Sequence, residues 1–141
     1  MRIPLIALPL TVTLAACAPT HAPARPDVGS DMAVVKVTAT YRERILLPPG
    51  HVLTVRVEDV SLMDAPSVVM AETQINLDGR APPYQVSLSI PRAQIVPQHT
   101  YSARADIRDA AGNLRFTTDT RHAVLTRDAP ASADIVMIGV R

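Results

Sequence analysis

Apolar and polar residues alternate along most of the chain after residue 31, with the period of two that half-buried β-strands produce. In the segment 35–41, valine, alanine and tyrosine alternate with lysine and threonine. The same alternation recurs in the segments 53–58, 84–90, 101–108 and 114–118. Each segment is predicted to be a strand with one buried and one solvent-facing side, as in antiparallel sheets.

Three further segments have weaker or different patterns. Val68 to Ile75 is apolar with poor alternation, and a strand at a sheet edge and a central strand covered on both sides remain equal alternatives. Ile135 to Val140 is a short unbroken apolar run, which predicts a strand that is buried centrally or covered on both faces. Pro91 to Ile95 predicts one helical turn that begins with proline.

Turn residues separate these segments. Pro48-Pro49-Gly50 combines fixed φ angles with a permissive glycine, and residues 109–113 predict a hairpin loop in which Gly112 takes the left-handed conformation. About seven or eight short strands, regular turns and no long helix together predict an all-β fold. We expect an antiparallel two-sheet β-sandwich over residues 31–141.

Glu43 interrupts the alternation that follows Tyr41. A continued strand would aim this carboxylate into the core at a cost of several kcal/mol unless it is paired. A bulge or bend near residues 42–44 avoids that cost, and it would also let the chain change sheets. The alternative is that Arg42, Glu43 and Arg44 form a recognition patch, although alternating charges are usually a solvated face.

The first residues have the features of a bacterial lipoprotein signal. Met1-Arg2 precedes an apolar stretch over residues 3–13, and Leu14-Ala15-Ala16 precedes Cys17, the only cysteine. The apolar run is shorter than the roughly 20 residues that span a bilayer. We expect residues 1–16 to be a signal peptide, Cys17 to be the lipid attachment site, and residues 17–30 to be a proline-rich tether.

The position after the cysteine predicts the destination of the protein. Ala18 stands there, whereas in the lipoproteins that this signal resembles an aspartate would favour retention in the inner membrane. The predicted location is the bacterial cell envelope, at the outer membrane and facing the periplasm, with the membrane contacted through the N-terminal lipid.

Composition argues against a nucleic-acid partner. The chain has 14 Lys+Arg and 13 Asp+Glu, and loss of Arg2 with the signal leaves a mature chain of formal charge zero. Nucleic-acid binding normally requires a basic face with stacking aromatic rings, and this chain has only four aromatic residues: Tyr41, Tyr84, Tyr101 and Phe116.

No residue pattern specifies a catalytic or cofactor site. His51, His99 and His122 lack the short-range ligand spacing of a zinc motif, and His21 lies in the predicted tether. Glu58 and Asp59 are adjacent carboxylates, but neighbouring residues on a strand face opposite sides. We predict no enzyme activity, no metal and no cofactor, although a triad of residues distant in sequence would escape this search.

A series of turn and core motifs extends from about Val35 to Val140: Tyr41-Arg42-Glu43-Arg44-Ile45, Leu47-Pro48-Pro49-Gly50, Glu58-Asp59-Val60-Ser61, Asp64-Ala65-Pro66, Pro83-Tyr84, Ile95-x-Pro97, Gly112-x-Leu114-x-Phe116-x-Thr118-Asp119-Thr120 and Val124-Leu125-Thr126-Arg127. They resemble the YbaY family of envelope lipoproteins. That family is similar to the YscW-type lipoprotein chaperones, or pilotins, which escort secretin subunits of type III secretion to the outer membrane. The resemblance implies a β-sandwich, a protein-binding role and no catalytic residues.

These observations predict a lipid-anchored, periplasm-facing module that binds an envelope or secretion-system protein in a chaperone-like way. An exposed strand edge or a groove would supply the contact surface. Two alternatives remain. One is a structural envelope lipoprotein without a dedicated client, and the other is a small ligand-binding or hydrolytic sandwich, which would need polar groups that converge in a pocket.

Substitution of Cys17→Ser is expected to abolish acylation, because the serine hydroxyl does not replace the thiol that accepts the lipid. Metabolic labelling with a fatty acid would show no incorporation, and the precursor would remain uncleaved. Normal labelling of the variant would contradict the lipoprotein interpretation.

Overall fold

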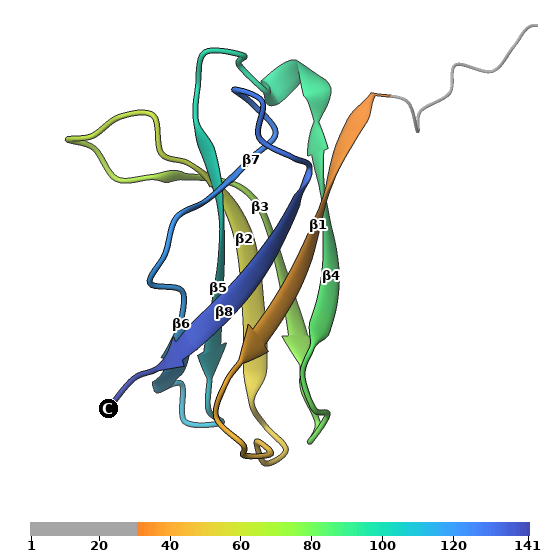
Figure 1. Cartoon of the computed structure of the whole chain (residues 1–141), viewed down its shortest axis with the longest axis vertical. Helices are drawn as coiled ribbons and strands as arrows, with labels where there is room; N and C mark the ends of the chain where they lie inside the picture. The colour runs from red at the N-terminus through yellow and green to blue at the C-terminus, as the bar shows by residue number, and fades with distance from the viewer. Residues whose placement is uncertain (1–30) are drawn as a thin grey trace, which may run out of the picture.

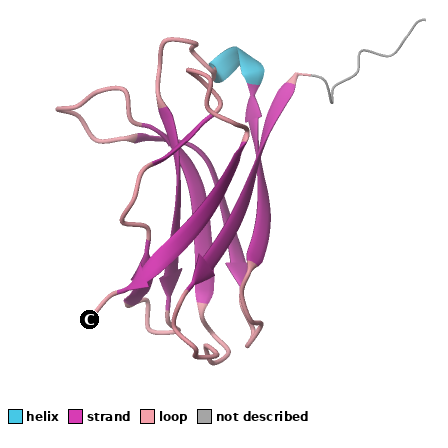
Figure 2. Ribbon diagram, viewed as in Figure 1, coloured by secondary structure: helices cyan, strands magenta, loops and turns pink. Residues whose placement is uncertain are grey.

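The computed structural model describes residues 31–141, so Cys17, the predicted signal peptide and the predicted tether lie outside the described residues. The described chain forms eight strands and one short 3₁₀ turn (Figures 1 and 2). They are β1 Met32–Tyr41, β2 Val52–Asp59, β3 Val68–Asn76, β4 Tyr84–Pro91, η1 Arg92–Gln94, β5 Tyr101–Arg108, β6 Leu114–Thr117, β7 His122–Val124 and β8 Ser132–Gly139.

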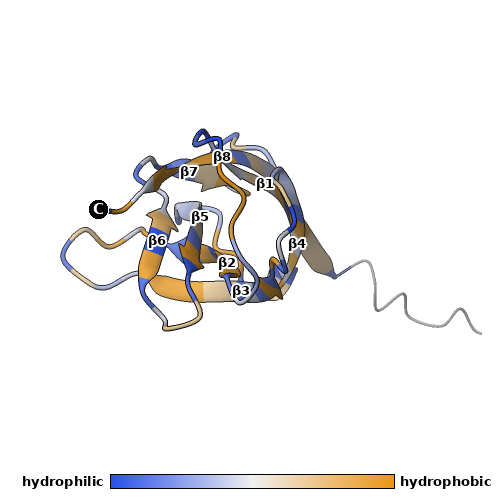
Figure 3. Ribbon diagram, turned by 90° about the horizontal axis from the view of Figure 1, so that it is seen from below, coloured by the Kyte–Doolittle hydropathy of each residue, from blue (hydrophilic) through white to orange (hydrophobic). Residues whose placement is uncertain are grey.

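All eight strands belong to one sheet, with the order β3-β2-β5-β6-β8-β1-β4 and β7 paired with β5. Seen along the strands, the sheet curves around a common interior in a nearly closed, barrel-like arrangement (Figure 3). The all-β class and the number of strands are confirmed. The expected clear division into two packed sheets is not seen, because the short ladder between β6 and β8 joins all the strands into one sheet.

The sheet is also not purely antiparallel. β1 pairs with β8 in parallel, from Lys36 opposite Ser132 to Tyr41 opposite Met137. On its other side β1 pairs with β4 in antiparallel orientation. The remaining ladders are antiparallel. The parallel pair places the first strand of the domain beside the last.

The predicted alternation places one side of each main strand in the interior. In β1, Val35, Val37, Ala39 and Tyr41 are buried, and β4 and β5 contribute Leu88, Ile90, Tyr101 and Ile107 to the same core. β8 departs from the prediction, because its buried and exposed residues alternate. Its two sheet neighbours cover only its edges, and Val136 and Ile138 face outward.

The local features predicted at turns are confirmed. Gly50 and Gly112 have φ angles of 92° and 86°, which only glycine adopts freely. The backbone bends at Glu43, directly after β1 ends, and the Glu43 side chain is exposed. After this bend the chain crosses to β2, which is not a neighbour of β1 in the sheet. The predicted helical turn is the 3₁₀ segment η1.

Tyrosine side chains connect the core to loop backbone. Tyr41 is stacked on Phe116 with ring centroids 4.6 Å apart, and its hydroxyl donates to the carbonyl of Ile45 at 3.0 Å. The Tyr84 hydroxyl donates to the carbonyl of Arg80 at 2.9 Å. Each ring is therefore buried while its polar end has a partner, as buried tyrosines require.

Substitution of Phe116→Ala is expected to lower the free energy of unfolding by about 3–5 kcal/mol, because it removes a buried ring and leaves a cavity beside Tyr41. Denaturant titration followed by circular dichroism measures this loss. Val136→Ala on the outer face of β8 is the control, and it should cost less than about 1 kcal/mol. Equal losses in the two variants would contradict the assigned packing.

Candidate functional site

β3 has a free edge. It pairs only with β2 among the described residues, and it faces β4 across the opening of the sheet without a ladder. The edge-strand interpretation of Val68 to Ile75 is therefore confirmed, and the covered central strand is wrong. This strand is nine residues long and contains neither proline nor lysine, the residues that commonly block edge pairing. Its backbone is a template on which another extended chain can pair.

Exposed apolar side chains adjoin this edge. The connection between β2 and β3 extends away from the body of the domain (Figure 1), and it carries Leu62 and Met63, which are 71% and 98% exposed. Val68 and Val69 at the start of β3 are also exposed. We call Leu62, Met63 and the free edge of β3 the β3-edge surface. Its side chains add little to the core, so they are available to a partner.

The outer face of β2 and β5 beside this surface carries a neutralised charge cluster. Arg56 pairs with Glu58 at 2.9 Å and with Asp106. Glu58, whose side chain is 7% exposed, also accepts a hydrogen bond from the Ser67 hydroxyl at 3.0 Å. Arg104 lies 4.0 Å from the same carboxylate. These partners offset the free-energy cost of removing the Glu58 carboxylate from water. The sequence analysis considered Glu58 only together with Asp59 and did not predict this cluster.

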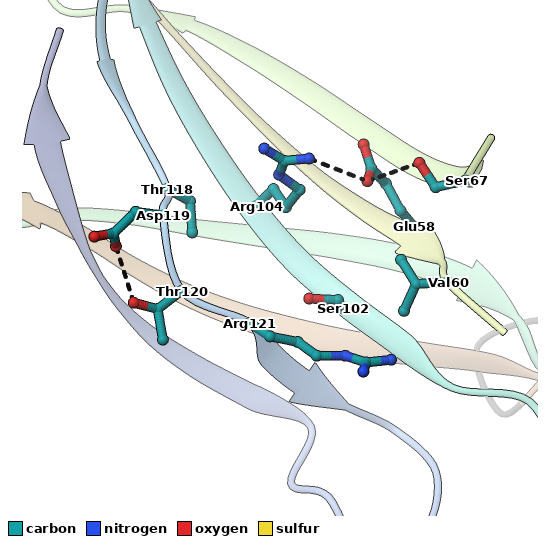
Figure 4. Close-up of a pocket in the computed structure, with 9 residues that line it drawn as sticks. All are labelled: Glu58, Val60, Ser67, Ser102, Arg104, Thr118, Asp119, Thr120 and Arg121. Atoms are coloured by element: carbon teal, nitrogen blue, oxygen red, sulfur yellow. Dashed lines mark hydrogen bonds and ion pairs between the residues drawn. The ribbon is translucent and has the colours of Figure 1, made fainter. Parts of the chain in front are cut away.

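A polar pocket of about 400 Å³ lies between this cluster and the chain segment that connects β6 with β7 (Figure 4). Glu58, Ser67 and Arg104 line one side, and Thr118 to Arg121 line the other. No histidine or cysteine lines this pocket. Its carboxylates, arginines and hydroxyls can hold a polar group, and two of its hydroxyls, those of Ser67 and Thr120, donate hydrogen bonds to Glu58 and Asp119.

Asp59, on the opposite side of β2 from Glu58, organises a second network. Its carboxylate accepts hydrogen bonds from the Ser61 hydroxyl at 2.5 Å and from His99 Nδ1 at 2.6 Å. Ser61 Oγ in turn accepts a hydrogen bond from the Thr100 amide at 2.8 Å. A catalytic triad requires histidine between serine and aspartate, whereas here aspartate lies between the other two. The network joins two loops at one end of the sheet.

This network controls the ionisation of Asp59. Burial favours the neutral acid, but the hydrogen bonds from Ser61 and His99 outweigh it and lower the pKa of Asp59 below its ordinary value. An ionised carboxylate only accepts hydrogen bonds, so Nδ1 of His99 carries the proton that the bond requires. The two residues are 40 positions apart in sequence, and no local pattern links them.

The other sequence candidates occupy separate places. The His51 ring forms a hydrogen bond to the carbonyl of Pro48 at 2.9 Å, and His122 lies in β7. Within residues 31–141, no three His, Cys, Asp or Glu side chains are arranged to hold a metal ion. No helix in the same region is long and apolar enough to cross a membrane. Arg42, Glu43 and Arg44 are exposed at the bend after β1.

Comparisons with known proteins agree on one type of protein. The family described as Type III secretion system lipoprotein chaperone (YscW) matches residues 30–137. The chain is 34% identical over 109 residues to the uncharacterized lipoprotein YbaY of Escherichia coli (strain K12). The aligned region covers 76% of this chain and 55% of YbaY. The chain thus spans about half the length of this curated relative.

A solved structure shows a similar fold. It is an alternative pilotin from the type II secretion system of Vibrio cholerae, with a TM-score of 0.74 and 37% sequence identity. The similarity covers 78% of this chain and 98% of the pilotin chain. The resemblance inferred from the turn and core motifs is therefore confirmed.

The lowered pKa of Asp59 predicts a loss of stability in acid. A carboxyl whose pKa is lower in the folded chain stabilises the fold above its unfolded value of 3.8, and that contribution disappears as pH falls through the folded value. Melting temperatures measured between about pH 7 and pH 2.5 should fall less steeply in Asp59→Asn than in the unchanged protein. Asp64→Asn, in an exposed loop, should keep the original profile. Equal slopes for Asp59→Asn and the unchanged protein would show that Asp59 contributes nothing.

Proposed function

The chain belongs to the YscW family of type III secretion system lipoprotein chaperones, and from this membership we propose that it is a lipid-anchored envelope protein that binds a secretion-system protein in a pilotin-like way. The similarity to YbaY and to a pilotin supports a lipoprotein with a chaperone-like role. The family consists of chaperones and not of enzymes, in keeping with an Asp59 network that lacks the order of a triad.

We propose that Cys17 carries the lipid and that the protein faces the periplasm from the outer membrane. The apolar run before Leu14-Ala15-Ala16, the single cysteine and Ala18 after it support this arrangement. Residues 18–30 would separate this lipid from the described domain. The lipid would therefore restrict the domain to the membrane vicinity while leaving it free to meet a partner.

The observation that carries the binding proposal is the free edge of β3. An extended segment of the client would pair with the β3 backbone and add a strand to the sheet. Leu62 and Met63 would add apolar contacts to that segment, because they are exposed in the connection that leads into β3. Backbone pairing and apolar contacts depend weakly on ionic strength, so binding at this surface should be weakly salt-sensitive.

This docking mode predicts the effect of proline on β3. Backbone N–H groups of successive strand residues point to opposite sides, so among Val68→Pro and Val69→Pro one substitution removes a free-edge N–H and the other removes a ladder N–H. We expect one variant to remain folded by circular dichroism and to lose crosslinks to its secretion-system client. Unchanged crosslinks in the folded variant would show that this edge is not the docking surface.

A side-chain substitution provides an independent check with a matched control. Val69→Lys places a charge beside the edge, whereas Val34→Lys places the same charge on an outward residue of β1 with similar exposure, 44% against 49%. Only Val69→Lys should reduce the crosslink yield, because lysine disfavours pairing along an edge. Equal yields from both variants would contradict docking along β3.

A further inference from the structure

A second exposed apolar surface lies along the outer face of β8. Val136 and Ile138 of this strand are 37% and 45% exposed, and Val140 and Ile45 beside them are 43% and 53% exposed. Two hollows of about 370 and 450 Å³ lie next to each other on this surface, because Glu43 and Ile138 line both of them. We call this surface the β8 groove; arginines 42, 115 and 141 also line it.

The core holds the β8 groove in shape. Tyr41 packs on Phe116 and fixes the backbone of Ile45 through its hydroxyl, so the segment after β1 is held beside the end of β8. Gly139 forms part of the floor. A Cβ atom at this position would lie 3.0 Å from a Glu43 carboxylate oxygen and 3.7 Å from the Phe116 ring. The groove is therefore largely formed before any partner binds, which lowers the entropic cost of docking.

The charged side chains of the β8 groove form no ion pair with other described residues. Three arginines line it against two carboxylates, Glu43 and Asp119, and Arg44 is exposed on the same bend. None of these side chains takes part in an ion pair between described residues. On the β2 and β5 face, by contrast, Arg56 contacts three carboxylates. The groove therefore combines apolar area with an excess of free positive charge.

The position and charge of the β8 groove argue against two possible binding partners, the membrane and a second copy of the chain. β1 begins at one end of the sheet, and the bend after β1 and the end of β8 lie at the other end (Figure 1). The groove thus faces away from the point where the chain enters from residues 1–30, which argues against the membrane as its occupant. A two-fold contact with a second copy would place the same patch against itself, and its three arginines would face only two carboxylates, so positive charge would remain unpaired.

We propose that the β8 groove binds a segment of the client that combines apolar side chains with aspartate or glutamate. The inference depends on the proposed client-binding function but uses a surface separate from the β3 edge. Apolar side chains would pack on Ile138 and Ile45, and acidic side chains would pair with Arg115 and Arg141. The interpretation of residues 42–44 as part of a recognition patch agrees with this assignment. Binding here is salt-sensitive, unlike binding at β3.

The test places a photo-crosslinking amino acid at Ile138 or, separately, at Val69 in the full-length protein within its own cells. The Ile138 probe should capture a client peptide that, when sequenced by mass spectrometry, contains at least two acidic residues among apolar ones. The double substitution Arg115→Glu and Arg141→Glu should lower this capture by about tenfold, as expected for two lost exposed pairs. High salt in isolated envelopes should lower it as well.

The control reverses two charges at the other end of the domain, Arg92→Glu and Arg127→Glu, and it should leave capture from position 138 unchanged. Circular dichroism confirms that both double variants fold. Capture of phospholipid, of a second copy, or of a peptide without acidic residues would overturn the proposal, as would capture that survives the charge reversal. Capture from position 69 alone would overturn the groove but keep the proposed function, whereas no capture from either position would overturn both.

Discussion

The parallel ladder between β1 and β8 is the contact on which the rest of the domain depends. Six residue pairs join these strands, and they are the only ladder between the β1–β4 pair and the remaining strands in the described sheet. The partners are nearly a full domain apart in sequence, so their pairing closes a long loop at an entropic cost. Burial of Val37, Ala39 and Ile135 along this contact offsets that cost.

Curvature of this single sheet also creates the surfaces that a partner can use. The sheet approaches closure but leaves β3 and β4 unpaired with each other, so two edges remain at the opening. On the other side of the ring, β8 pairs with β6 only through Ile138 and Gly139. This short ladder leaves most of that side of β8 without a paired neighbour. Both candidate surfaces therefore occur where the sheet is incompletely paired.

The sequence predicted the parts of the structure that local chemistry controls. Alternation located the main strands, the glycines at positions 50 and 112 located turns, and a carboxylate that would enter the core located the bend at Glu43. The poor alternation of apolar and polar residues in β3 led to an edge strand as one of two predicted alternatives, the other being a covered central strand. Each of these features depends on residues that are close together in the chain.

Features that depend on distant residues were not predictable. A period of two reports which side chains are buried, and it is the same for two packed sheets and for one sheet that curves nearly to closure. The pattern therefore could not tell these two arrangements apart. β7 has only three residues, too few to display a period. In the charge cluster Arg56 and Asp106 are 50 positions apart. Near Glu58 the sequence offers only Arg56, which lies two residues earlier and so on the same face of the strand.

The place of β1 inside the sheet has a mechanical consequence. Any tension from the preceding chain enters the domain at Met32 and acts along a strand that is paired on both sides, by eight residue pairs with β4 and six with β8. A load along the strands strains these ladders together in shear, whereas a load at an edge strand would open one ladder pair by pair. A domain held by its N-terminus is thus pulled through a strand that is paired on both sides, and its resistance to forced unfolding is a property of the unfolding rate.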